Sequence, residues 1–261
     1  MTQPEPVEAQ GLSEAAVTAM ESAMAVLVLA AITDFLNRAR ELVMAPWRRF
    51  GMPPDPAPIQ DLDTWWSDRI SDLMADLLRA AKRGWDASAA QLGVSIPFDP
   101  QDSFVLAQLD ASENLLVNVD SEIYAMVIRI IADGADNGWT NAQIADRVDN
   151  VLSVTGTPNW PNRADVIART EVRRFANAGQ FAAAQRVTAD TGRMFEKVWV
   201  DRDDDRVRAS HARADGQRRM LTDFFDVGNS DLLYPGHWAG RPEDVINERC
   251  RMIIREVRRA R

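Results

Sequence analysis

The segment from Trp199 to Gly216 concentrates the residue types that carry out acid-base chemistry. Aspartate and arginine are interspersed through most of it, and His211 and Asp215 follow near its end. A histidine oriented by an aspartate can act as a general base or as a metal ligand. The alternative is structural: the Asp and Arg side chains pair with each other, and His211 and Asp215 organise the turn at Gly216. We favour the structural interpretation, because ion-pair networks use the same residue types as active sites.

Three aspartates in this segment are spaced like the first ligands of a calcium-binding loop. They are Asp201, Asp203 and Asp205. Such a loop needs glycine at its sixth position and glutamate at its twelfth, and these positions hold Arg206 and Ala212. We therefore expect a charged, solvated turn here.

The supply of zinc ligands is also small. Zinc sites usually draw four ligands from closely spaced cysteines and histidines. The chain has His211, His237 and Cys250, with no closely spaced pair among them. The sequence therefore predicts no metal ion, and nothing in it indicates another cofactor.

Glu171 interrupts an apolar helical stripe, since it lies four residues after Ile167 and four before Phe175. A carboxylate in that position is expected to be buried, and a buried carboxylate needs a partner. Arginines from the segment after Trp199 are the expected partners, in an ion pair that joins helix to sheet.

Arginines recur at the end of the chain. Arg255, Arg258, Arg259 and Arg261 are candidates for contacts with DNA phosphates. No aromatic residues are interleaved with them, as a groove for single strands would require. The same arginines could instead dock on an acidic helical surface, including that of this chain's own first half. The sequence leaves both interpretations open.

The charge of the whole chain is unevenly distributed. Its 261 residues carry 30 Lys and Arg against 39 Asp and Glu, a net charge of −9. Residues 1–160 hold 10 basic and 23 acidic side chains, or −13, and residues 161–261 hold 20 and 16, or +4. The acidic total argues against a generic nucleic-acid coat protein. The split indicates two parts that have different electrostatic partners or that face each other.

Several features bear on the compartment in which the protein matures. One cysteine cannot form an intramolecular disulfide, and residues 1–10 lack the basic and apolar segments of a secretory signal. The longest apolar run, residues 23–32, is about half of the roughly 20 residues that span a bilayer. We therefore expect maturation in a reducing cytoplasm, without secretion and without a membrane.

Periodic apolar residues predict four long helices, and prolines or glycines separate them. The helices are expected at about residues 13–44, 59–92, 101–135 and 163–187. A capping box of Thr140 and Gln143 predicts a short helix before the last of these. Strands are expected at residues 195–200, 218–221 and 251–257.

These elements predict an α+β protein. A flexible arm at residues 1–11 precedes an all-helical docking region of long helices at residues 12–135. Residues 136–261 form a small C-terminal α+β domain with a short, mainly antiparallel sheet.

Several blocks of the sequence resemble a known family. The blocks are Gly138-Trp139-Thr140, Ile144-Ala145, Ile167-Ala168-Arg169-Thr170-Glu171-Val172, Asn177, Trp199, Asp204-Asp205-Arg206-Val207-Arg208, His211, Asp215-Gly216, Pro235-Gly236 and Ile246-Asn247-Glu248-Arg249-Cys250-Arg251. In order and spacing they resemble the phage Mu F-like head morphogenesis family, over about residues 135–257.

The resemblance implies a minor capsid protein of a tailed bacteriophage, a virion component in the head interior or near the portal. The implied partners are the portal protein, the major capsid protein, or both, and the packaged DNA, in an oligomeric assembly formed in the host cytoplasm. No enzymatic mechanism follows, so the implied set of catalytic residues is empty. The family's motif residues fall on Thr170, Glu171, Asp204, Arg206, Arg208, His211, Asp215, Gly216, Asn247 and Cys250.

One departure from the family pattern concerns cysteine. Many relatives end in Asn-Cys-Arg-Cys, whereas this chain has Asn247-Glu248-Arg249-Cys250 and keeps only the second cysteine. This difference argues against a cysteine-based metal site or cross-link.

Two alternative functions remain at this point. One is a metal-dependent hydrolase or nuclease centred on His211, with Asp204, Asp205 or Glu248 as its acidic residue. The other is a DNA-binding module that uses the C-terminal arginines, whose affinity would fall steeply as salt rises.

Overall fold

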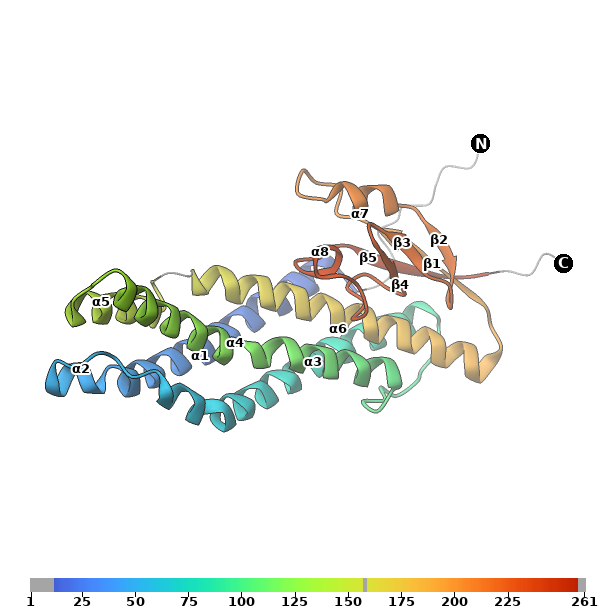
Figure 1. Ribbon diagram of the computed structural model, residues 1–261. Helices are drawn as coiled ribbons and strands as arrows, with labels where there is room; N and C mark the ends of the chain where they lie inside the picture. The colour runs from blue at the N-terminus through green and yellow to red at the C-terminus, as the bar shows by residue number, and fades with distance from the viewer. Residues whose placement is uncertain (1–11, 157–158, 258–261) are drawn as a thin grey trace. The chain divides into compact units, whose positions relative to one another are not determined.

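The computed structural model describes residues 12–156 and 159–257 (Figure 1). These residues form two compact units, each assembled from separate stretches of the chain. The first unit comprises described residues within Met1–Ser22, Asp76–Ala111 and Ala168–Arg261, and the second comprises Ala23–Ala75 and Ser112–Ile167. The predicted arm at residues 1–11 lies outside the described residues. The predicted boundary between residues 135 and 136 does not coincide with this division and stays a prediction.

The structure confirms the predicted long helices. They are α1 (Glu14–Val43), α3 (Asp63–Gln91), α4 (Ser103–Asp136) and α6 (Trp160–Thr191). A short helix α2 (Ala45–Phe50) and a 3-10 turn, η2 (Ala57–Leu62), occupy the proline-rich segment that the sequence left without regular structure. Proline stands in the first turn of both, where its missing amide hydrogen costs no helical hydrogen bond.

The predicted capping box opens α5 (Asn141–Val151). The Gln143 amide donates to the Thr140 hydroxyl at 3.3 Å, and the Thr140 amide donates to Gln143 Oε1 at 2.9 Å. Each side chain thus satisfies a backbone amide that has no partner within the helix.

Within the first unit, α3 and α6 approach each other closely at two glycines. A Cβ atom on Gly84 would lie 1.9 Å from the carbonyl oxygen of Ala176, and one on Gly179 would lie 1.9 Å from that of Ala81. Only a residue without a side chain fits at either place, so these two glycines set the distance between the helices.

The predicted strands form a three-stranded antiparallel sheet of order β2-β1-β5. Its members are β1 (Phe195–Val200), β2 (Arg218–Met220) and β5 (Arg251–Glu256), and the central residue Val198 pairs with Arg218 on one side and Ile253 on the other. A separate hairpin of β3 (Phe225–Val227) and β4 (Ser230–Leu232) follows β2. Two short helices complete this part, α7 (Ala209–Ala214) and α8 (Pro242–Val245). The α+β class predicted from the sequence is confirmed.

Two apolar clusters hold the first unit together. One joins α6 to the sheet, through α6 residues such as Phe181 and strand residues such as Phe195 and Ile254. The other lies among α7, α8 and the β3-β4 hairpin, and it contains Trp199 and Cys250. Burial of large apolar side chains stabilises the fold by about 1.5–3 kcal/mol each, so these clusters fix the positions of the loops described below.

The helical segment Glu14–Phe50 is long and apolar enough to cross a membrane, by length and composition alone. Its most apolar 18-residue window has a mean hydropathy of 2.0, and 28% of that window is buried. The core helix of a soluble protein meets the same test. The expectation that no membrane is involved therefore stays a prediction.

Candidate functional site

Helix α6 holds the loop before β5 through two adjacent residues. Arg169 Nη1 donates to the side-chain oxygen of Asn247 at 2.7 Å, and the Asn247 amide donates to the Thr170 hydroxyl at 2.8 Å. Asn247 has a left-handed backbone with φ of +57°, which asparagine adopts more readily than most residues. The motif residues Thr170 and Asn247 thus form one contact that fixes the entry to β5.

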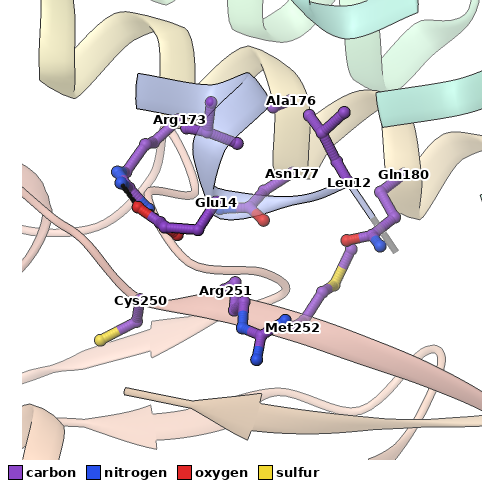
Figure 2. A pocket seen from close by; sticks show the side chains of 10 residues that line it. Leu12, Glu14, Arg173, Ala176, Asn177, Gln180, Cys250, Arg251 and Met252 are labelled. Atoms are coloured by element: carbon purple, nitrogen blue, oxygen red, sulfur yellow. Dashed lines mark hydrogen bonds and ion pairs between the residues drawn. The ribbon is translucent and has the colours of Figure 1, made fainter. Parts of the chain in front are cut away.

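One turn further along α6, Arg173 joins the start of α1 to the same loop. Its buried guanidinium pairs with Glu14 and with Glu21 at 2.6 Å, and it donates to the Arg249 carbonyl at 3.0 Å. Burial acts to lower the pKa of Arg173, but the two carboxylates outweigh it and raise that pKa above its ordinary value. Burial raises the pKa of Glu21 despite its arginine partner. Figure 2 shows Arg173 and Glu14 side by side at a cavity that β5 also lines.

Glu171 is buried, as the sequence predicts, and it has a partner on its own helix. Its carboxylate lies 3.0 Å from the guanidinium of Arg174, three residues further along the same helix. The expected pairing with an arginine after Trp199 stays a prediction. Other α6 residues connect this helix to the C-terminal loops, among them Asn177, which donates to the Pro235 carbonyl at 3.0 Å.

The charged segment after β1 folds as turns that pair with the loop before β5. Arg249 donates to both carboxylate oxygens of Asp204, at 2.6 Å each. This hydrogen bonding lowers the pKa of Asp204 to about 2. Asp204 also accepts the Arg206 amide at 3.0 Å, and Arg208 donates to the Ile246 carbonyl. Most of the charges singled out from the sequence are therefore engaged within the protein.

Asp215 and Gly216 close the turn that follows α7. The Asp215 carboxylate accepts the Asp201 amide at 3.0 Å, and the Gly216 amide donates to the Trp199 carbonyl at 3.0 Å. Gly216 has φ of +73°, in the region that glycine adopts without strain. The contact between His211 and Asp215 is made by the backbone, because the Asp215 amide donates to the His211 carbonyl at 3.1 Å.

The His211 side chain faces two residues from the loop before β5 instead. Its Nδ1 atom lies 2.5 Å from Glu248 Oε2 and 3.5 Å from Cys250 Sγ. All three residues are 2–3% exposed. Glu248 Oε1 accepts the backbone amides of Arg249 at 2.6 Å and Cys250 at 2.5 Å. Sequence reasoning named His211 and Cys250 as motif residues. It named Glu248 only as one possible acidic residue of the hydrolase or nuclease alternative.

The ionisation of this cluster follows from burial and from its neighbours. Burial raises the pKa of Glu248, but the His211 imidazole and hydrogen bonds from Cys250 outweigh it, and the net shift is downward. Burial raises the pKa of the Cys250 thiol, and the Glu248 charge raises it further. Without a bound cation, Glu248 is therefore a carboxylate and Cys250 a neutral thiol, which is a poor nucleophile.

A cavity of about 120 Å³ adjoins this cluster and is open to solvent. It is lined by Arg202, Arg206, Val207, Arg208, His211, Asn247, Glu248, Arg249 and Cys250. Four guanidinium groups thus surround an entrance that leads to three buried side chains.

Comparison with known proteins finds a family match over part of the chain. Residues 125–253 match the family described as Phage Mu protein F like protein. This region is similar to that family, and we call it the Mu F-like region. The resemblance read from the sequence is thereby confirmed, and every motif residue described above lies within the matched range.

One relative is the minor head protein GP7 of Bacillus phage SPP1, which is 30% identical to this chain over 147 residues. The match covers 54% of this chain and 45% of that protein, so the chain spans less than half of the relative's length. No solved structure matches the chain.

The Mu F-like region brings together most of the predicted motif residues, but not the predicted DNA contacts. Arg255 lies half-buried in β5, opposite Glu196 of β1. Arg258, Arg259 and Arg261 lie outside the described residues. The DNA contacts stay a prediction.

Sequence reasoning missed a buried lysine in the Mu F-like region. Lys197, in β1, is completely buried and donates to the carbonyls of Leu221 at 3.0 Å and Leu233 at 2.7 Å. Burial lowers its pKa to about 7. Burial also lowers the pKa of nearby His237 to about 4, and the Lys197 charge adds to that shift. The alternation of Phe195, Lys197 and Trp199 was a signal that position 197 faces the interior.

Proposed function

We propose that this protein is a minor head protein of a tailed bacteriophage, acting as a structural component of the virion rather than as an enzyme. The observation that carries the proposal is the match of residues 125–253 to the Phage Mu F-like family. The similarity to a minor head protein of phage SPP1 supports it. That match covers less than half of the relative's length, so the role of the whole chain is part of this proposal.

The contacts of the motif residues favour a structural role. Thr170 and Asn247 bind each other, Asp204 is held by two hydrogen bonds from Arg249, and Asp215 closes a turn. A catalytic carboxylate must be able to reach a substrate or metal, and these polar groups are already engaged by protein partners. The hydrolase or nuclease alternative places the reaction at His211. It predicts that the wild-type chain has such an activity and that the folded His211→Ala variant loses it completely.

The finer proposal is that the chain docks on the portal or the major capsid protein during procapsid assembly and DNA packaging. Its first 160 residues carry a net charge of −13. On α1, Val26 is 67% exposed and Leu27 is 41% exposed. We propose that these exposed apolar side chains are part of the docking surface. Docking would bury them in the assembled head.

Co-expression of the full chain with the portal and major capsid proteins of its phage tests this proposal. We expect the chain to sediment with procapsids, and we expect Val26→Asp with Leu27→Asp to weaken that association at least tenfold. Phe224→Asp, at an exposed apolar residue of the Mu F-like region, is the matched control. A wild-type chain that stays in the soluble fraction while procapsids form would overturn the proposal.

A further inference from the structure

Three side chains of different chemistry meet in the interior of the Mu F-like region. His211 comes from α7, and Glu248 and Cys250 come from the loop that enters β5. One imidazole nitrogen, one carboxylate oxygen and the thiol sulfur all lie within 4.8 Å of one another. Imidazole, carboxylate and thiolate are the ligand types from which zinc sites are built.

The carboxylate of this cluster is in contact with the other two side chains. Glu248 Oε1 accepts two backbone amides, and Oε2 lies 2.5 Å from His211 Nδ1. A buried imidazole, carboxylate and thiol whose ligand atoms all lie this close together could bind one cation jointly.

The nitrogen–sulfur distance fits one tetrahedral ion, and the nitrogen–oxygen distance must lengthen to admit it. Bonds of about 2.1 Å to nitrogen and about 2.3 Å to sulfur, at a tetrahedral angle, place the two donor atoms about 3.6 Å apart. Nδ1 and Sγ are 3.5 Å apart in the structure. The carboxylate must withdraw from its 2.5 Å contact with Nδ1 by somewhat less than about 1 Å to admit the ion.

We propose that His211 Nδ1, Glu248 Oε2 and Cys250 Sγ bind a zinc ion. The mixture of a soft sulfur ligand with nitrogen and oxygen selects zinc over magnesium or calcium, which take oxygen ligands. The fourth position faces the cavity lined by arginines, where water completes the coordination. This inference goes beyond the proposed function and does not depend on it.

Zinc at this place would tie α7 to the start of β5. The ligands come from segments 39 residues apart, and binding would release the Cys250 proton. The expected consequence is structural: the ion would stabilise the folded Mu F-like region.

The test uses cobalt, because Co²⁺ replaces Zn²⁺ and gives a near-ultraviolet charge-transfer band when a thiolate binds it. Cys250 is the single cysteine, so any such band reports this site. We expect the reduced full chain to show the band at one Co²⁺ per chain, zinc to abolish it by displacement, and zinc to raise the melting temperature. A folded wild-type chain without the band and without the rise would overturn the proposal, and this arm needs no variant.

Variants then assign the ligands. We expect Cys250→Ser to abolish the band and His211→Ala and Glu248→Gln to weaken cobalt binding at least tenfold, with the fold checked by circular dichroism. His237→Asn changes the other histidine and is the matched control, in which the band should persist. A band that His237→Asn removes, or that His211→Ala leaves at full affinity, would contradict the assignment.

Discussion

At the scale of single residues, Lys197 is a charged side chain in an apolar environment. Its ammonium group is buried, donates to two backbone carbonyls, and lies 5.0 Å from the ring centroids of Phe181 and of Phe225. Since burial lowers its pKa to about 7, the unfolded chain binds this proton more tightly than the folded protein does. The free energy of unfolding therefore depends on pH.

Lys197→Met is expected to flatten that dependence. Between pH 7 and the unfolded pKa of about 10.4, the unfolded state holds more protons, so the free energy of unfolding rises with pH. From pH 7 to pH 9 Lys197 should contribute a rise of about 2 kcal/mol, which the variant should lack. Urea unfolding at both pH values measures the difference. Lys82→Met, at the exposed second lysine, should keep the wild-type slope, and an equal slope in wild type and Lys197→Met would refute the expectation.

The sequence predicted the burial of Glu171 but not its partner. Burial followed from the helical period, which is local information. The ion pair with Arg174 could have been read from the three-residue spacing, which places both side chains on one face of the helix. The cluster of His211, Glu248 and Cys250 was not predicted, because Glu248 is neither a cysteine nor a histidine and His211 lies 39 residues from Cys250 in the sequence.

At the scale of elements, the contact between α3 and α6 depends on two glycines. In an exposed helix, glycine-to-alanine stabilises by about 1 kcal/mol. Here we expect the opposite sign, because the added Cβ would collide with a backbone carbonyl. Gly84→Ala and Gly179→Ala should each destabilise the protein by about 2 kcal/mol or more. Thermal or urea unfolding measures this, with Arg83→Ala on the exposed face of α3 as a control expected near zero.

The attachment of α1 to α6 rests on Arg173. Arg173→Met would leave Glu14 and Glu21 without this partner, and we expect a loss of about 3 kcal/mol in the free energy of unfolding. Arg202→Met, which removes a more exposed partner of Glu14, should cost less than about 1 kcal/mol. Equal losses of unfolding free energy in the two variants would contradict the expectation that the buried Arg173 stabilises the protein more than Arg202 does.

The long helices could be predicted from the sequence, and several of the short elements could not. Four helices of 29 to 34 residues repeat their apolar period many times. The strands β3 and β4 have three residues each, too few for alternation to stand out. The Gly228-Asn229 pair between them, with Gly228 at φ of +64°, was the available signal for a hairpin. Helix α2 was not predicted, because Pro46 was interpreted only as the residue that ends the preceding helix. Proline is also favoured in the first turn of a helix, which is its position in α2.

At the scale of the whole molecule, the chain contains a Mu F-like region and a more acidic, helical remainder. The sequence predicted the family resemblance and the fold class, because the motif blocks and the helical periods are both local patterns in the sequence. It did not predict the division into units built from separate stretches, since that division depends on which long helices pack together. The function proposed for the whole chain therefore rests on the region that matches the family.

The most direct test of that function is quantitative mass spectrometry of purified procapsids and mature virions of the phage that encodes this chain. The account predicts that the chain copurifies with the heads in a fixed, low ratio to the major capsid protein. It also predicts that an early stop codon in its gene reduces infectious particles, and that expression of the full chain restores them. Heads that contain none of this chain and remain fully infectious would contradict the central claim.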